Sequence, residues 1–252
     1  MRLQDAVCVV TGGAAGQGRA VATRFAAEGA SVLILDVDAD RGRETAAEIR
    51  GRGNSATFLQ CDVSDESNWL QVRTHLESKF GHASVLYNNA AVFLPEDRSV
   101  LEMEVATWDR VMAVNVRSVF LACKHIVPGM IERGGGSVIN IASIRASLGT
   151  TVPQDAYAAS KGAVVSLSRS LAAEFAQHNV RVNVISPGTI LTEMAPIQDP
   201  IVAAERLKRY PMGRFGTTGD VEGAAVYLAS EESAWTTGVE LLIDGGTTSF
   251  YV

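Results

Sequence analysis

The chain has 252 residues, 47% of them hydrophobic, which favours an α/β domain with a sizeable core and argues against disorder. The formal net charge of −6 gives no general electrostatic reason to bind nucleic acid or an anionic membrane. The early apolar run, residues 6–10, is too short for a signal-peptide core or a membrane span. Cys8, Cys61 and Cys123 are too far apart for a disulfide framework or a metal site, so we expect a cytoplasmic protein without a metal.

Short apolar runs alternate with helical patterns along the chain. Buried strands are predicted at residues 6–10, 31–35, 56–59, 85–87, 137–141, 180–185 and 239–243. Helices are predicted at 16–29, 40–52, 64–80, 107–130, 157–177 and 220–229, with Asp40 and Ser64 as N-caps of the second and third. This alternation predicts a single α/β domain, 1–252: a doubly wound parallel sheet of about seven strands with helices on both faces. The irregular stretch 189–219 is the expected substrate lid.

Ligands of such sheets bind outside the carboxyl ends of the strands. We therefore examined the residues that end or follow the predicted strands, namely Gly12, Asp36, Asp62, Asn89, Ser143 and Pro187.

Residues 11–18 join the first strand to the first helix through glycines spaced G-x-x-x-G-x-G. Glycine allows a tight turn and a close approach of backbone to ligand, and the helix N-terminus offers N–H groups to a pyrophosphate. This spacing differs from the commoner G-x-G-x-x-G, and no G-K-[ST] follows, which disfavours a P-loop hydrolase.

Tyr157 and Lys161 are four residues apart, which places them on one face of a helix. A lysine ammonium beside a phenol favours the phenolate, so we expect Lys161 to lower the pKa of Tyr157. The tyrosine could then exchange a proton during a reaction. Taken alone, the pair is a weak signal that favours an incidental tyrosine and a solvated lysine.

Several motifs occur in one order at the ends of the predicted elements. They are residues 11–18, Asp62-Val63, Asn88-Asn89-Ala90-Ala91, Asn115, Ser143, Tyr157 with Lys161, Pro187-Gly188 with Thr192, and Asp244-Gly245-Gly246. With these motifs the chain resembles a short-chain dehydrogenase/reductase over essentially its whole length. The resemblance implies an enzyme that transfers a hydride between a nicotinamide cofactor and a secondary alcohol or its ketone.

The resemblance also implies roles for four catalytic residues. Tyr157 would be the general acid and base, and Lys161 would lower its pKa and bind the nicotinamide ribose. Ser143 would donate a hydrogen bond to the substrate oxygen. Asn115 would hold a water in a proton relay, although an asparagine that only binds backbone is the alternative.

The implied cofactor residues lie at the strand ends. They are Gly12, Gly16, Gln17, Gly18, Asp36, Asp62, Val63, Asn89, Ala90, Tyr157, Lys161, Pro187, Gly188, Ile190 and Thr192. Asp62 and Val63 would lie at the adenine and Asn89 at the ribose. The chain departs from the family in Gln17, where an aliphatic residue is commoner, and in Ala91, where glycine is usual. Alanine is tolerated there if φ is negative.

Asp36 predicts NAD as the cofactor. A carboxylate at the end of the second strand can accept hydrogen bonds from both ribose hydroxyls of NAD, and it would repel the 2′-phosphate of NADP. We expect no compensating arginine, because Arg41 should face solvent on the next helix and Arg19 could instead meet the pyrophosphate.

Phe93 and Arg145 are expected to wall the substrate pocket. Arg145 could hold a carboxylate or phosphate, or it could reach solvent or pair with an acid of the lid. The sequence does not identify the substrate. Two alternatives are a catalytically silent NAD-binding regulatory protein of the same fold and a nucleotide-sugar epimerase or dehydratase. The second is disfavoured because only a lid-sized segment remains for the substrate. The apolar helix from Tyr157, with the one from residue 107, predicts a homotetramer by the resemblance.

Overall fold

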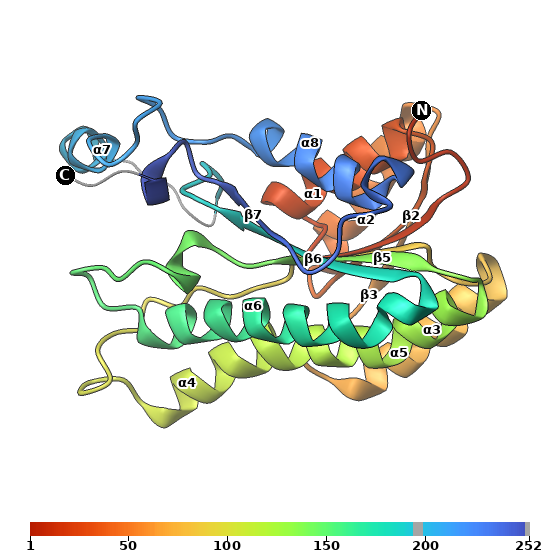
Figure 1. Ribbon diagram of the computed structural model, residues 1–252, viewed down its shortest axis with the longest axis horizontal. Coiled ribbons are helices and arrows are strands. Elements are labelled where there is room, and N and C mark those ends of the chain that lie inside the picture. Colours follow the sequence, from red (N-terminus) through yellow and green to blue (C-terminus); the bar gives the residue numbers. More distant parts are fainter. Residues whose placement is uncertain (194–198, 250–252) are drawn as a thin grey trace.

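The computed structural model describes residues 1–193 and 199–249. Its centre is one seven-stranded parallel sheet with strand order β3-β2-β1-β4-β5-β6-β7 (Figure 1). The strands are β1 Val7–Thr11, β2 Ser31–Asp36, β3 Ser55–Gln60, β4 Val85–Asn88, β5 Gly136–Ile141, β6 Val180–Pro187 and β7 Glu240–Ile243. The predicted doubly wound α/β fold is therefore confirmed.

The helices form two layers, one on each side of the sheet (Figure 1). They are α1 Gly16–Ala27, α2 Ala39–Gly51, α3 Glu66–Lys79, α4 Val105–Met112, α5 Ser118–Glu132, α6 Asp155–Phe175, α7 Pro200–Leu207 and α8 Thr218–Ala229. Helices α1, α2 and α8 cover one face, and α3, α4, α5 and α6 cover the other. Helix α7 lies beyond the carboxyl ends of the strands, outside both layers.

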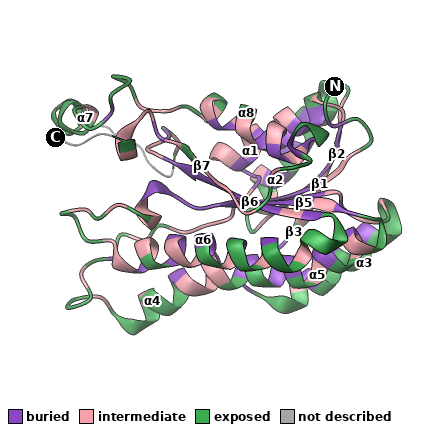
Figure 2. Cartoon of the chain, viewed as in Figure 1, coloured by how far each residue is buried: buried purple, intermediate pink, exposed green. Residues whose placement is uncertain are grey.

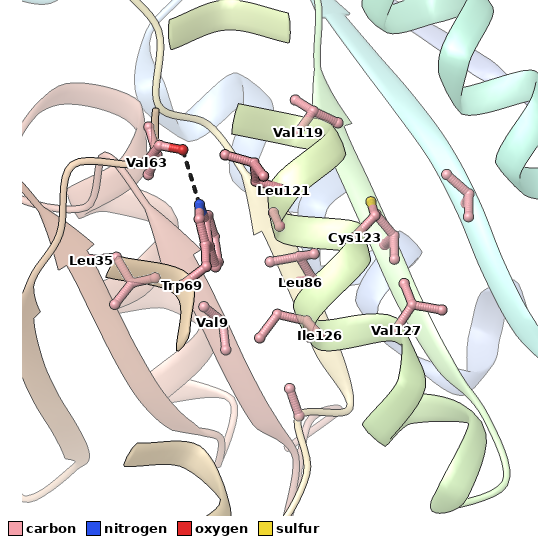
Figure 3. Close-up of a cluster of buried hydrophobic side chains, with 14 of the residues drawn as sticks. Val9, Leu35, Val63, Trp69, Leu86, Val119, Leu121, Cys123, Ile126 and Val127 are labelled. Carbon is pink, nitrogen blue, oxygen red and sulfur yellow. Dashed lines mark hydrogen bonds between the residues drawn. The ribbon is translucent and has the colours of Figure 1, made fainter. Parts of the chain in front are cut away.

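Each layer encloses its own hydrophobic core, and burial is concentrated in the strands and the helix faces turned toward them (Figure 2). Successive residues of β1 serve opposite cores, because side chains alternate across a strand: Val9 packs into one and Val10 into the other. Trp69 is fully buried, and its indole N–H donates to the Val63 carbonyl at 2.9 Å (Figure 3). This contact fixes the start of α3 against the end of β3.

Two predicted N-caps are wrong. Helix α2 is capped by Asp38, whose carboxylate accepts from the Arg41 N–H, and not by Asp40. Helix α3 is capped by Asp65, and Ser64 donates its hydroxyl to Asp62 instead. In both cases a nearby aspartate is better placed, since it precedes the first helical residue directly.

The predicted helix 107–130 is longer and is not uniform. It runs through α4, a π-helical turn at Ala113–Arg117 and α5. Among the residues that the structure describes, this 28-residue stretch, Val105–Glu132, is the one helix long and apolar enough to cross a membrane by length and composition. However, 56% of its most apolar window is buried within the protein, as in the core helix of a folded domain.

The segment 189–219 is less irregular than expected, because it contains α7. Asp199 caps this helix by accepting from the Ile201 and Val202 N–H groups, and Pro200 occupies the first turn. Aspartate followed by proline is a recognisable helix start, so the sequence carried this signal.

Candidate active site

Tyr157 and Lys161 lie one turn apart near the start of α6. Lys161 is only 3% exposed, and its Nζ donates a 2.8 Å hydrogen bond to the carbonyl of Ile141, the last residue of β5. The same ammonium lies over the Tyr157 ring, 5.5 Å from its centre. Burial lowers the pKa of Lys161 to about 8, because an ammonium loses its hydration in the interior.

The pKa of Tyr157 is raised by burial. The hydrogen bond with Ser143 and the positive charge of Arg145 act in the opposite direction but are outweighed. The expectation that Lys161 lowers this pKa is therefore wrong for this arrangement. The ammonium hydrogen-bonds the Ile141 carbonyl and lies over the ring, so desolvation of the phenolate dominates.

Ser143 and Phe93 complete the surroundings of Tyr157. Ser143 lies just past the end of β5, is 9% exposed, and accepts a hydrogen bond from the Arg145 N–H at 3.2 Å. The Phe93 ring packs edge-on against the Tyr157 ring with centres 5.3 Å apart, and 39% of Phe93 is exposed. Tyr157, Lys161 and Ser143 are thus brought together, and Phe93 forms a wall beside them.

Asn115 is buried in the π-helical turn and has a structural task. Its Oδ1 accepts from the Val92 N–H at 2.8 Å, and its Nδ2 donates to the Val92 carbonyl and to the Ser160 hydroxyl, each at 3.1 Å. The side chain therefore joins the segment after β4 to α6. Asn115 thus hydrogen-bonds backbone, as the alternative interpretation expected. The proton relay remains a prediction.

The glycine-rich turn packs closely against the end of β4. Gly12 has φ +63°, and a Cβ there would come within 2.9 Å of the Ala90 Cα. A Cβ on Gly18 would lie 2.0 Å from the Gly12 carbonyl oxygen, so neither glycine can be replaced without moving backbone. The Asn89 amide donates to the Gly12 carbonyl at 3.1 Å. Ala91 is not among the residues with positive φ, so alanine is unstrained there.

The end of β6 closes the opposite side of the turn. Ile190 is 4% exposed and pairs with Gly216 across the lid, and Thr192 lies 3.5 Å from the position of a Cβ on Gly16. Pro187 ends β6, and the N–H of Gly188 donates to the Ile243 carbonyl at 2.9 Å. Residues predicted at the cofactor thus converge from β1 and β6.

This arrangement fits a dinucleotide. The N-terminus of α1, at Ala15, has no side-chain cap, which leaves its N–H groups for an external anion. The Gln17 Oε1 atom is buried without a hydrogen-bond partner among the described residues. A buried polar atom without a partner is costly, and a cofactor amide could satisfy it.

Asp36 supports the glycine-rich turn from β2. Its two carboxylate oxygens accept from the Ala14 and Asp38 N–H groups, each at 3.0 Å. Arg41 lies on the next helix as expected, but it forms an ion pair, and the contact of Arg19 with a pyrophosphate stays a prediction. The Nη2 group of Arg41 donates to both carboxylate oxygens of Glu193 at 2.8 and 2.7 Å, and that of Arg19 donates to both oxygens of Glu48 at 2.6 and 2.7 Å. Each arginine is thus neutralised by a carboxylate from another segment of the chain.

Asp62 and Val63 follow β3. Burial raises the pKa of Asp62, but hydrogen bonds from the Ser64 N–H and hydroxyl outweigh it and hold that pKa below its usual value. Val63 is 5% exposed and belongs to the hydrophobic core with Trp69. Asp62 thus lies at the strand end as a stabilised carboxylate, while Val63 is largely buried by the protein itself.

The geometry agrees with comparisons to known proteins. A family model described as enoyl-(acyl carrier protein) reductase matches residues 12–248. The chain is 37% identical to 2-(S)-hydroxypropyl-CoM dehydrogenase 3 of Xanthobacter autotrophicus over 98% of each chain. It is also 37% identical to 2,5-dichloro-2,5-cyclohexadiene-1,4-diol dehydrogenase of Sphingobium indicum over 97% of each. The crystal structure of a putative short-chain dehydrogenase/reductase from Burkholderia xenovorans superposes with a TM-score of 0.93 at 35% identity, covering 100% of this chain and 99% of that one.

The chain belongs to the short-chain dehydrogenase/reductase family. It is therefore an oxidoreductase of a family that uses NAD or NADP. The relatives act on small molecules, as their names state.

A residue that sequence analysis missed fixes the catalytic helix of this short-chain dehydrogenase/reductase. Asp97, in the segment after β4, is 4% exposed, and its carboxylate accepts from the N–H of Ala156 at 3.0 Å and of Tyr157 at 2.8 Å. Asp155 reaches back and accepts from the Val100 N–H at 2.8 Å. Because Asp97 is far from α6 in sequence and in no motif, only the tertiary structure reveals it.

A second missed group is a buried polar chain beneath the site. The Asn88 amide donates to Asn140, and the Asn140 amide donates to the Ser168 hydroxyl, both at 2.8 Å. It links β4, β5 and α6. Asn140 is the fifth residue of β5 and interrupts the apolar run Val138, Ile139 and Ile141, and that polar interruption was the available signal.

Arg145 lies in a short 3-10 turn, Ile144–Ala146, and is half-buried. Burial lowers the pKa of its guanidinium. Within residues 1–193 and 199–249 the guanidinium has no hydrogen-bond or ion-pair partner, so it does not pair with a described acid of the lid. In the same residues no cluster of three His, Cys, Asp or Glu is placed to hold a metal ion.

Proposed function

We propose that the chain transfers a hydride between NAD(H) and the carbinol carbon of a secondary alcohol or its ketone. The observation that carries the proposal is the convergence of Tyr157, Lys161 and Ser143 at the carboxyl end of β5. In a parallel sheet this is the same edge at which the glycine-rich turn lies. The names of the relatives, which are dehydrogenases of hydroxyl-bearing compounds, support the same chemistry.

In the proposed mechanism the bound nicotinamide supplies the hydride acceptor or donor, and the chain manages the proton. Ser143 donates a hydrogen bond to the reacting oxygen. Tyr157 gives its hydroxyl proton to the substrate oxygen in reduction, and its phenolate accepts the alcohol proton in oxidation. The raised pKa of Tyr157 keeps the phenol protonated at neutral pH, which suits the acid role. Lys161, with a pKa of about 8, is mostly an ammonium at neutral pH and can donate hydrogen bonds to the ribose.

A dehydrogenase screen with NAD⁺ against secondary alcohols, polyols, hydroxy acids and cyclic alcohols tests this proposal. Tyr157→Phe removes only the hydroxyl, so folding and NAD binding should survive while turnover falls by roughly 10²–10⁴-fold. Circular dichroism and a direct NAD titration provide the controls. Near-native turnover of the variant would exclude Tyr157 as the acid and base. An NAD-binding chain inactive on the whole panel would support the silent regulatory alternative.

We propose NAD rather than NADP because of Asp36. The arginine nearest to it, Arg41, is neutralised by Glu193, so a 2′-phosphate would meet the Asp36 carboxylate without compensation. We expect kcat/KM to be clearly higher with NAD than with NADP. Asp36→Ala should reduce this difference, mainly by raising kcat/KM with NADP. Steady-state kinetics with both cofactors measures this. Equal kcat/KM values for the two cofactors in the unmodified enzyme would contradict the assignment.

We further propose a single catalytic domain over 1–252 in which residues 189–219 act as a lid on the substrate. The ion pair of Arg41 with Glu193 joins that segment to α2, beside the expected adenosine site. A cytoplasmic location is proposed because Cys8, Cys61 and Cys123 are all free thiols and buried. By the family resemblance, assembly as a homotetramer is also proposed.

A further inference from the structure

We infer that the substrate carries an anionic group, a carboxylate, sulfonate or phosphate, which Arg145 binds together with Arg206 and Arg209 of the segment 189–219. This inference rests on the proposed function and names the substrate class of the same site.

The first observation is the state of Arg145. Its side chain is half-buried two residues past Ser143, close enough to Tyr157 for each charge to act on the other. None of its guanidinium donors has a partner within residues 1–193 and 199–249. Partial burial of an unpaired charge is costly, and donors that keep access to solvent are free to bind a ligand. A planar donor group beside the catalytic tyrosine is suited to a bidentate contact with an anion.

The second observation is that the segment carrying two more arginines, both exposed, is anchored close to this place. Tyr210 is 9% exposed, and its hydroxyl donates to the Thr189 hydroxyl at 2.6 Å and accepts from the Thr189 N–H at 3.1 Å. This anchor fixes the end of the α7 segment beside the end of β6. Arg206 and Arg209, within four residues of the anchor, are near enough to act on the pKa of Arg145, as like charges do.

The third observation is how the lid distributes its charges. All three acids of residues 189–219 are engaged elsewhere: Glu193 pairs with Arg41, Glu205 pairs with Lys208, and Asp199 caps α7. Arg214 is likewise paired, with Asp220 outside the segment.

Arg206 and Arg209 are the remaining arginines of residues 189–219, and neither has an ion-pair partner among the described residues. The five residues of the lid left undescribed, 194–198, are Met, Ala, Pro, Ile and Gln, which carry no acid. Arg145, Arg206 and Arg209 thus act on one another as like charges without a carboxylate partner among the described residues, and an anionic substrate would relieve that repulsion.

Matched pairs of substrates test the inference. We would compare 3-hydroxybutanoate with its methyl ester, and 2-hydroxypropane-1-sulfonate and 2-hydroxypropyl phosphate with 2-butanol, all with NAD⁺. The unmodified enzyme should show a higher kcat/KM for the anionic member of each pair. Comparing the three anionic substrates shows whether the site favours a carboxylate, a sulfonate or a phosphate. Arg145→Gln should lower kcat/KM for the preferred anion by about ten- to a hundredfold, the loss expected for hydrogen bonds to a charged group, and should change kcat/KM far less for the neutral members, on which Arg145 acts only through the pKa of Tyr157. Arg206→Gln with Arg209→Gln should act in the same direction.

Lys208→Gln is the matched control, since it removes a positive charge from the same segment at a side chain already paired with Glu205. A second readout needs no turnover: ethanesulfonate or malonate, added with NAD⁺, should raise the Tm of the unmodified enzyme and of Lys208→Gln but not of Arg145→Gln.

Equal turnover of charged and neutral members, with no anion-dependent rise in Tm, would overturn the inference and leave the dehydrogenase proposal intact. Failure of every alcohol, with the Arg145-dependent rise in Tm still present, would contradict the dehydrogenase proposal and support the anion site.

Discussion

Lys161 combines a buried ammonium with a hydrogen bond to one backbone carbonyl, and no carboxylate of the described chain pairs with it. Its pKa of about 8 is lower than the value near 10.4 of an exposed lysine, so the unfolded chain binds a proton more readily than the folded one between these values. The stability of the folded protein should therefore rise with pH across this window. Below pH 8 the buried charge costs on the order of 3 kcal/mol.

Lys161→Met tests this at the residue scale. Methionine fills similar space without the charge. The free energy of unfolding of the variant should therefore exceed that of the unmodified protein most at pH 7, and the difference should shrink as the pH rises toward 10. Urea unfolding of both proteins at several pH values measures the difference. Parallel stability curves would show that Lys161 keeps an ordinary pKa.

At the scale of the element, Asp97 decides how α6 begins. Its carboxylate accepts from the N–H groups of Ala156 and Tyr157, two of the donors that a helix start leaves unpaired, and it is favoured by the helix dipole. Asp97 is thus a positioning residue, because it fixes the backbone that carries the Tyr157 hydroxyl.

Asp97→Asn preserves the shape of the side chain but leaves only one oxygen that can accept a hydrogen bond from the start of α6. We expect a loss of about 1–2 kcal/mol in the free energy of unfolding, because one buried N–H group loses its acceptor, and a several-fold lower kcat with unchanged affinity for NAD. Asp65→Ala, at the cap of α3, is the control that should cost stability without lowering kcat. A normal kcat in Asp97→Asn would reduce Asp97 to a stabilising cap.

At the scale of the whole molecule, the helical layer that contains α4, α5 and α6 exposes apolar side chains on its outer surface. Phe120 on α5 is 50% exposed, and Trp108 on α4 is 36% exposed. On α6, on the same face of the sheet, Ala159, Ser166 and Ala173 form an exposed row of small side chains at seven-residue spacing. Small residues let another helix approach closely, which supports the proposed tetramer.

Phe120→Glu should therefore shift the assembly to smaller species, because it places a charge in an apolar contact. Sedimentation velocity at micromolar concentration measures this. Leu70→Glu, on α3 at a side chain 54% exposed, is the control and should leave the assembly intact. A monomeric unmodified protein would contradict the proposed assembly.

The sequence by itself determined the family, the fold class and the edge of the sheet at which the site lies. These follow from local signals: strands and helices have their own periods, and glycines and polar residues mark the strand ends. Tyr157 with Lys161 and the glycines of residues 11–18 could be read in this way, since each motif is contiguous or within one helical turn.

Tertiary structure alone decided the electrostatics and the long-range contacts. The direction of the pKa shift of Tyr157 depends on how deeply α6 is buried, and the partners of Arg19 and Arg41 lie 29 and 152 residues away. Asp97 meets Tyr157 across 60 residues, and the uncompensated charge of Arg145 appears only when every nearby acid is seen to be engaged elsewhere. Such properties belong to the surroundings of a residue in space, which no local pattern in the chain encodes.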